Sequence, residues 1–240
     1  MEISGGEPLL HKDIFKIIEY GKSKKLEIRL YTNGIYLNAA SVKELARIGL
    51  DKVLLGVYGA SPVVHDKITG QKGSFFKTIK TIKNLKQKGI YVGIHFVPMK
   101  ISYRELGSLA EMAKSIGADE LAILRFVPQG RGEENKSLLA LNSKEEKRLL
   151  GGMENMRKKY KFLRLGCPID LSLKCKAGED TLAVRPDGIV NLCPAFKQKK
   201  IVGNVKRQSL RQIWEKSPVL TEIRELKKGS RVCLARSFYN

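Results

Sequence analysis

Cysteine is missing from the first two-thirds of the sequence, and all four cysteines lie in the C-terminal third, at positions 167, 175, 193 and 233. A secreted disulfide framework would place its cysteines throughout a much shorter chain that carries a signal sequence. In a reducing compartment, thiols gathered in one region indicate metal binding, redox chemistry or small buried residues. The first functional question is therefore what this C-terminal group of cysteines holds.

Long apolar runs are also missing, because charged residues or glycines interrupt every stretch before the ~18 to 20 residues that a bilayer span needs. The opening residues, Met1 to Gly6, form neither a basic n-region nor an apolar h-region. We therefore expect a cytoplasmic protein without membrane attachment. With 42% hydrophobic and 29% charged residues among 240, the chain can bury a core in one large domain or two modest ones.

Acidic residues are scarce relative to basic ones: 24 Asp and Glu stand against 45 Lys and Arg, a net charge of +21. Such an excess attracts anionic ligands and keeps a basic nucleic-acid-binding module open as one alternative. Many of the lysines recur at three-residue intervals, as at Lys77, Lys80, Lys83 and Lys86. That spacing is typical of the solvated face of a helix.

The first two-thirds of the chain alternate short apolar runs with amphipathic stretches. The runs are rich in β-branched residues and cover 26–31, 52–58, 90–97 and 120–127. Glycines precede them where helices should end, at Gly21, Gly49, Gly89 and Gly117, and we expect these four to be C-caps. The pattern predicts an α/β fold with βα units and a parallel sheet of about five strands, counting a short one at Ile3.

The character of the sequence changes near residue 165. Residues 182–193, LAVRPDGIVNLC, combine two β-rich arms with a Pro-Asp-Gly turn and predict a hairpin. A short helix is expected at 209–216. Asn142 and Ser143 are expected to cap a helix inside a linker. The predicted organisation is 1–141 as the α/β domain, 142–164 as a helical linker and 165–240 as a second domain.

Ligands of parallel sheets bind at the carboxyl ends of the strands, so the loops that follow the predicted strands are informative. SGGEPLL follows the first strand, YTNG the second and YGASPVVHDKITGQKGSF the third. This ordered series resembles the radical S-adenosylmethionine superfamily. The later segment CKAGEDTLAVRPDGIVNLCPAF, followed by GNV, SL and IW, resembles the SPASM/twitch extension that holds auxiliary iron-sulfur clusters. The resemblance implies a partial parallel (β/α) TIM-like barrel without its first βα unit and a small α+β SPASM/twitch-like domain.

The resemblance assigns cofactor-binding roles to residues of the first domain. The loop of Gly5, Gly6, Glu7 and Pro8 matches the motif that contacts the methionyl amino group of S-adenosylmethionine. Thr32 and Asn33 match the next loop, near the methionyl and ribose parts. Family members usually show Ser and Asp in an SLDG-type loop, where this chain has GVYG over residues 56–59. That departure weakens the prediction that a side chain of this loop contacts the cofactor.

Two other residues of this region, Arg125 and His65, carry ionisable side chains. Arg125 lies inside the apolar run 120–127, at a strand end that faces the expected cavity, where its guanidinium could bind a carboxylate of the cofactor or substrate. His65, in VVHDKITG, is expected to be structural.

The family's catalytic cluster is bound by a Cys-x-x-x-Cys-x-x-Cys loop after the first strand, and no cysteine precedes Cys167 here. Lysines cannot replace these ligands, because iron-sulfur clusters need soft anionic donors. Met1 is then either an internal start within a longer reading frame or the start of a degenerate or split member. As given, the chain is not expected to generate a radical by itself.

The cysteines have the spacing Cys167-x7-Cys175-x17-Cys193-x39-Cys233, which fits a generic zinc ribbon poorly. Cys175 and Cys193 match the pair that flanks the hairpin of the SPASM extension, and Cys233 matches the first cysteine of its terminal pair. Cys167 or an open site would complete an auxiliary 4Fe-4S cluster. The alternative is a set of reduced thiols packed in a small core.

The resemblance implies reductive cleavage of S-adenosylmethionine, by the full-length form, to modify a peptide, protein or cofactor precursor. The expected partners are that substrate and a reductant such as a ferredoxin or flavodoxin. Two alternatives stay open: a non-catalytic auxiliary iron-sulfur or electron-transfer protein, and the basic nucleic-acid-binding module.

Overall fold

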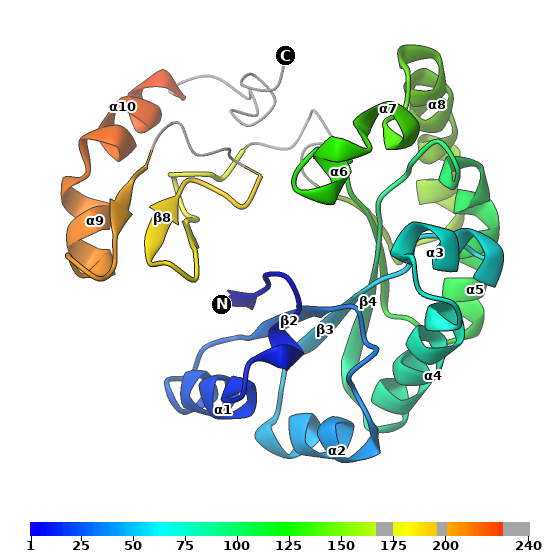
Figure 1. Cartoon of the computed structure of the whole chain (residues 1–240), viewed down its shortest axis with the longest axis horizontal. Coiled ribbons are helices and arrows are strands. Elements are labelled where there is room, and N and C mark those ends of the chain that lie inside the picture. Colours follow the sequence, from blue (N-terminus) through cyan, green and yellow to red (C-terminus); the bar gives the residue numbers. More distant parts are fainter. Residues whose placement is uncertain (167–174, 196–200, 228–240) are drawn as a thin grey trace. The chain divides into compact units, whose positions relative to one another are not determined.

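The structure is a computed structural model that describes residues 1–166, 175–195 and 201–227 (Figure 1). The chain divides into two compact units, residues 1–166 and 167–240. Among the described helices, none combines the length and the hydropathy needed to cross a membrane.

The first unit is built on a six-stranded parallel sheet whose strands follow one another in chain order. The predicted parallel α/β fold is therefore confirmed, with one strand more than the five expected. The strands are β1 Glu2–Ile3, β2 Arg29–Thr32, β3 Lys52–Gly56, β4 Tyr91–Phe96, β5 Glu120–Ile123 and β6 Leu163–Leu165.

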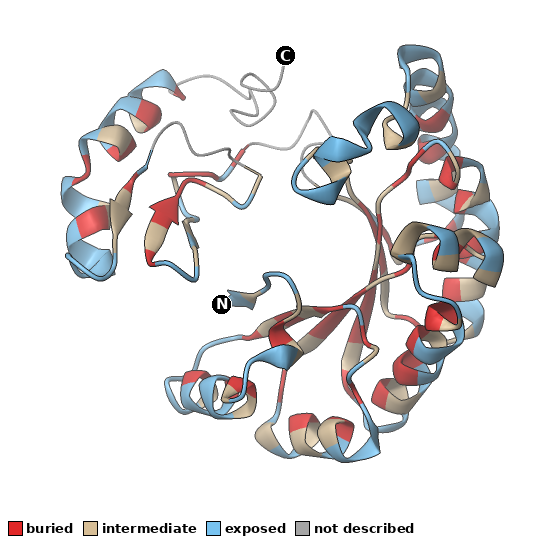
Figure 2. Ribbon diagram, in the orientation of Figure 1, coloured by how far each residue is buried: buried red, intermediate tan, exposed pale blue. Residues whose placement is uncertain are grey.

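Side chains alternate between the two sides of the strands, and this gives the sheet an apolar face and a more polar face. Leu30, Val53 and Val92 stand in register on adjacent strands and are fully buried. Helices α1, α2, α4, α5 and α8 lie along this apolar face (Figures 1 and 2). Successive side chains of a strand point to opposite faces, so Lys52 and Tyr91, also in register, belong to the other, more polar face.

Helices alternate with the strands of the first unit. Their bounds are η1 Pro8–Leu10, α1 Ile14–Ser23, α2 Ala39–Ile48, α3 Pro62–Thr69, α4 Ser74–Gln87, η2 Tyr103–Glu105, α5 Leu106–Ser115, α6 Arg131–Glu134, α7 Lys136–Leu139 and α8 Ser143–Lys159. Asn142 caps α8 together with Glu145 in a capping box, as its position before an acidic first turn predicts.

Three of the four predicted glycine caps are confirmed. Gly49, Gly89 and Gly117 have φ of 73°, 72° and 74° at helix ends. Gly21 was predicted wrongly, because it lies inside α1, where a Cβ would come within 2.6 Å of Ile28 Cδ1. Lys25 takes the left-handed position after α1 instead, with φ of 59°. The Leu26 amide bonds back to the Gly21 carbonyl, which closes the end of the helix.

Residues 142–164, expected to form a helical linker, contain α8 and the start of β6. The helix is present, and β6 pairs in parallel with β5 through Leu121 and Leu163. This segment therefore supplies the last strand of the first unit.

In its described residues, 175–195 and 201–227, the second unit contains a three-stranded antiparallel sheet and two helices. The predicted hairpin is present: Ala183 pairs with Asn191, and Gly188 turns the chain with φ of 88°. Ser209 caps the expected short helix in a capping box with Gln212. The elements are β7 Ala183–Val184, β8 Ile189–Asn191, β9 Gly203–Asn204, α9 Leu210–Lys216 and α10 Pro218–Leu226.

Candidate functional site

The loop after β1 exposes its backbone. Gly5 and Gly6 are both exposed, and a Cβ built on either would meet nothing within 4 Å. Gly5 has φ of +149°, a conformation that side-chain-bearing residues rarely adopt. Pro8 is buried and begins η1, so it fixes the exit of the loop. A polar ligand can therefore approach the amides and carbonyls at Gly5 and Gly6 closely.

Glu7 joins this loop to the loop after β2. Its Oε1 accepts hydrogen bonds from the Leu9 amide at 3.1 Å and from Thr32 Oγ1 at 2.7 Å. Its Oε2 accepts one from the Asn33 amide at 2.8 Å. The carboxylate thus holds two strand-end loops in a fixed relation, a role that the resemblance alone did not indicate.

The loop after β2 is held from both sides. Thr32 is buried, and its Oγ1 accepts a bond from the Gly34 amide at 3.1 Å. On the other side, Thr78 and Thr81 of α4 donate to the Asn33 and Gly34 carbonyls at 3.1 and 2.9 Å. Asn33 itself is exposed, and its Oδ1 accepts from the Ile35 amide at 2.9 Å. Thr32 and Asn33 therefore belong to a rigid platform beside Gly5 and Gly6.

The third loop contains the departure from the usual family pattern. A Cβ at Gly56 would lie 2.8 Å from the Tyr58 hydroxyl, so the phenol ring of Tyr58 folds back over Gly56. The Tyr58 amide donates to Nδ1 of His65 at 3.2 Å. His65 is buried against Phe75, and burial lowers the pKa of its imidazole, which favours the neutral form. These contacts agree with a structural role for His65.

Arg125 lies two residues beyond the end of β5 and is half-buried. The preceding residue, Leu124, donates its amide to the Phe96 carbonyl at 2.8 Å and so continues the alignment of β4 and β5. Arg125 is thus at the same carboxyl edge of the sheet as the three loops.

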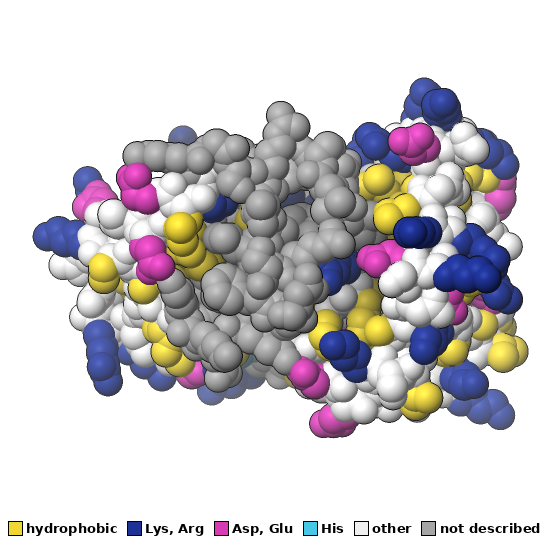
Figure 3. All heavy atoms as spheres, turned by 90° about the horizontal axis from the view of Figure 1, so that it is seen from above, with side chains coloured by type: hydrophobic (Ala, Val, Ile, Leu, Met, Phe, Trp, Pro, Cys, Tyr) yellow, Lys and Arg dark blue, Asp and Glu magenta, His cyan; other side chains and the backbone are white. Residues whose placement is uncertain are grey.

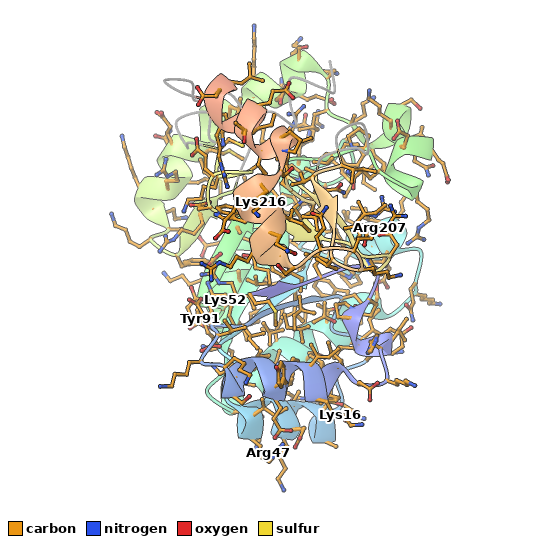
Figure 4. The ribbon with its side chains drawn as sticks, turned by 90° about the vertical axis from the view of Figure 1, so that its left-hand side faces the viewer. Lys16, Arg47, Lys52, Tyr91, Arg207 and Lys216 are labelled. Atoms are coloured by element: carbon orange, nitrogen blue, oxygen red, sulfur yellow. The ribbon has the colours of Figure 1, made fainter. Side chains whose placement is uncertain are left out.

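A group of charged and aromatic residues on the polar face of the sheet was missed from the sequence. Lys52 Nζ donates to Glu120 Oε2 at 2.9 Å and lies 4.1 Å from the centre of the Tyr91 ring. The Tyr91 hydroxyl donates to the same Glu120 oxygen at 3.2 Å. Figure 4 shows Lys52 and Tyr91 next to each other. Lys52 and Tyr91 each begin a strand that is otherwise rich in apolar residues. This polar first residue is the signal in the sequence that could have indicated the group.

The electrostatics of this face follow from burial and pairing. Burial by itself would raise the pKa of Glu120, but the hydrogen bond and charge of Lys52 outweigh it and lower the pKa. Burial raises the pKa of Tyr31, and Glu2 raises it further. The ring of His95 meets Tyr31 edge-on at 5.0 Å, and burial lowers its pKa. At neutral pH, the face therefore carries a compensated ion pair beside a protonated phenol and a histidine for which burial favours the neutral form.

Two of the predicted metal ligands lie in the described part of the second unit. Cys175 is buried and Cys193 half-buried, and both pack in the small core of this unit. Cys167 and Cys233 lie outside the described residues. Within the described ranges, no group of three or more His, Cys, Asp or Glu side chains is arranged to hold a metal ion. Two soft thiols within one small core suit an iron-sulfur cluster as donors.

Basic residues are dispersed on the surface. Lys22, Lys86 and Lys159 are paired with Asp51, Asp119 and Glu111. In the view of Figure 3, the Lys and Arg side chains form separate groups between acidic and uncharged ones. Among the described residues visible in that view, this distribution gives no support to a continuous basic surface for nucleic acid.

Comparison with known proteins places these observations in a family. The model of the Radical SAM superfamily matches residues 1–113, and the model of the SPASM iron-sulfur cluster-binding domain matches residues 175–235. The AdoMet-dependent heme synthase of Methanosarcina barkeri is 28% identical, over 96% of this chain and 73% of that protein. The subtilosin biosynthesis protein AlbA of Bacillus subtilis is 26% identical, over 92% of this chain and 50% of AlbA.

Among solved structures, SuiB of Streptococcus suis has the same fold. It superposes with a TM-score of 0.77 at 18% identity, and the match covers the whole of this chain and 63% of SuiB. The chain thus spans between half and three-quarters of the length of these proteins. It is a member of the radical SAM superfamily that carries a SPASM iron-sulfur cluster-binding domain.

Proposed function

We propose that this chain is part of a radical SAM maturase that acts on a peptide. S-adenosylmethionine would bind at the carboxyl edge of the sheet, along Gly5, Gly6, Pro8 and the Thr32–Asn33 loop, and Arg125 would bind a carboxylate. In the full-length protein, S-adenosylmethionine bound to a catalytic iron-sulfur cluster would be reductively cleaved with an electron from that cluster. Of the expected segments 1–141, 142–164 and 165–240, we assign α8 and β6 of the middle one to the radical SAM domain, and the SPASM/twitch-like domain follows them.

The observation that carries the proposal is the link made by Glu7. Because its carboxylate bonds to Thr32 Oγ1 and to the Asn33 amide, the open Gly5–Gly6 backbone is fixed beside the second loop. A ligand that bridges both loops meets a preorganised surface and loses little free energy in ordering it. The amides and carbonyls there suit the amino and carboxylate groups of a methionyl moiety.

A peptide substrate is supported by the relatives. AlbA is named for the biosynthesis of the bacteriocin subtilosin, and SuiB has been solved bound to its precursor peptide SuiA. The SuiB match that includes the peptide has a TM-score of 0.76 and covers 93% of this chain. The relative named as a heme synthase keeps a cofactor precursor as the alternative substrate class.

The auxiliary cluster would be held by Cys175, Cys193 and Cys233, with Cys167 or an open site in the fourth position. A reductant such as a ferredoxin or flavodoxin would supply electrons. Anaerobic reconstitution with iron and sulfide tests this part of the proposal. We expect about four irons per chain and a loss of iron in Cys175→Ala and Cys193→Ala, while a chain that takes up no iron would contradict it.

A non-catalytic auxiliary iron-sulfur or electron-transfer protein is the second candidate, supported by the match of residues 175–235 to an iron-sulfur cluster-binding domain. The two functions differ in whether the chain binds S-adenosylmethionine. Because the chain as given is not expected to form 5′-deoxyadenosine under either function, a titration of S-adenosylmethionine into the reconstituted chain decides between them. Iron uptake without binding of S-adenosylmethionine supports the second candidate.

A further inference from the structure

Lys227 is a buried cation in the second unit. Only 2% of its side chain is exposed, whereas lysines are almost never fully buried unless they are paired. Its Nζ donates hydrogen bonds to the backbone carbonyl of Cys175 and, at 3.0 Å, to that of Ala177. Glu179 Oε1 lies 3.6 Å from the same nitrogen. The ammonium group is therefore directed at the segment that contains a candidate cluster ligand.

The same segment is held at a second point by helix α10, whose C-cap residue is Lys227. Arg224 of α10 donates through Nε to the Gly178 carbonyl at 3.0 Å and through a terminal nitrogen to the Trp214 carbonyl at 3.1 Å. Residues 175–178 are thus attached to α10 and its C-cap residue by two cations. Of these two, Lys227 donates to the carbonyl of Cys175 itself.

A structural role alone does not require a charge at this position. Burying an ammonium group costs several kcal/mol, and an apolar side chain of similar size would fill the space without that cost. Two carbonyls and a carboxylate at 3.6 Å offset part of the cost. A positive charge beside Cys175 becomes useful once that thiolate binds a cluster, because a thiolate-ligated cluster is anionic and gains a further negative charge on reduction.

We propose that Lys227 is a positioning residue for the auxiliary cluster: it fixes the Cys175 segment and raises the reduction potential of the cluster bound there. This inference rests on the proposed function, because it needs a cluster at Cys175. It concerns the affinity of that cluster for electrons. Lys227 does not ligate the iron.

The test compares three variants of the full chain after anaerobic reconstitution. Lys227→Met removes the buried charge, and Lys227→Arg keeps it. Lys216→Met removes one charge from the same unit at an exposed lysine of α9, which Figure 4 labels. Iron per chain and the midpoint potential in a dithionite redox titration are measured for each variant.

We expect Lys227→Met to shift the one-electron reduction equilibrium toward the oxidised cluster by about tenfold, which is a drop of 59 mV in potential. Lys227→Arg should restore most of the wild-type potential, and Lys216→Met should leave it unchanged. Iron-loaded Lys227→Met with the wild-type potential would overturn the inference. If Lys227→Met loads no iron, the midpoint potential of the cluster in Lys227→Arg becomes the test. A potential close to that of the wild type supports the inference, and a drop in potential overturns it. A wild-type chain that binds no iron would instead overturn the proposed function and this inference with it.

Discussion

Replacing Glu7 by glutamine probes the link between the two strand-end loops. The substitution keeps the size of the side chain but exchanges one acceptor oxygen for an amide nitrogen. The new amide nitrogen takes the place of one of the two carboxylate oxygens. In the place of Oε2 it faces the Asn33 amide, which donates there at 2.8 Å in the wild type. In the place of Oε1 it faces the Leu9 amide and the Thr32 hydroxyl. At least one hydrogen bond to a charged acceptor is lost.

The size of the effect follows from the nature of that bond. Hydrogen bonds to charged groups contribute about 1.5 to 3 kcal/mol, and the exposure of Asn33 places this one at the lower end. A loss of about 1.5 kcal/mol corresponds to roughly a tenfold increase in the local opening equilibrium. Amide hydrogen exchange reports such local openings directly.

The assay is amide exchange at Leu9 and Asn33 in Glu7→Gln and in Glu27→Gln. Glu27 is 60% exposed and pairs with Arg29 at the surface, so its substitution should leave both amides unchanged. We expect about tenfold faster exchange at one or both amides in Glu7→Gln only. Wild-type exchange at both positions, or an equal increase in the two variants, would refute the role assigned to Glu7.

Three further predictions concern stability in urea unfolding. Lys25→Gly should raise the free energy of unfolding by about 0.5 to 1 kcal/mol, because glycine takes a φ of 59° without strain; a loss of stability would contradict this. Gly21→Ala should cost about 1 to 3 kcal/mol, because its Cβ would meet Ile28 Cδ1 at 2.6 Å. The matched Gly151→Ala, at an open site on α8, should gain up to about 1 kcal/mol, and equal effects of the two substitutions would be inconsistent with the packing. Lys52→Met should cost about 2 kcal/mol at pH 7, because it leaves the Glu120 carboxylate partly buried without its cation. The lowered pKa of Glu120 means that the pair stabilises the fold above the ordinary carboxyl pKa and that this contribution is lost as the pH falls through the lowered value. The difference from the wild type should therefore shrink between pH 7 and pH 3, and a pH-independent difference would argue against the pairing.

Local signals in the sequence predicted the architecture well where they were strong. The strands around 52–58 and 90–97 are long and apolar, and the glycines at 49, 89 and 117 follow periodic helices, so their roles could be read directly. Strand β6 has only three residues, and Arg164 interrupts its apolar character. Its pairing with β5 depends on tertiary contacts that no local pattern encodes.

The site could be predicted only in part for a similar reason. Gly5, Gly6, Thr32 and Asn33 were singled out because their loops follow strands, which meet at one edge of a parallel sheet, and because these loops resemble the family's motifs. Their binding of S-adenosylmethionine stays a prediction. The bonds of Glu7 and the Lys52–Glu120 pair join residues 25 and 68 positions apart, and these partners are set by the register of the sheet. Gly21 was misread because tight packing on Ile28 requires glycine as much as a helix end does.

The central claim, that S-adenosylmethionine binds at the carboxyl edge of the sheet, is tested most directly by titrating it into the chain labelled with ¹⁵N-glycine. The account predicts that the resonances of Gly5, Gly6 and Gly34 shift with saturation, while those of Gly151 and Gly152 on α8 stay in place. Shifts that avoid the first three glycines, or no shift at millimolar ligand, would contradict it.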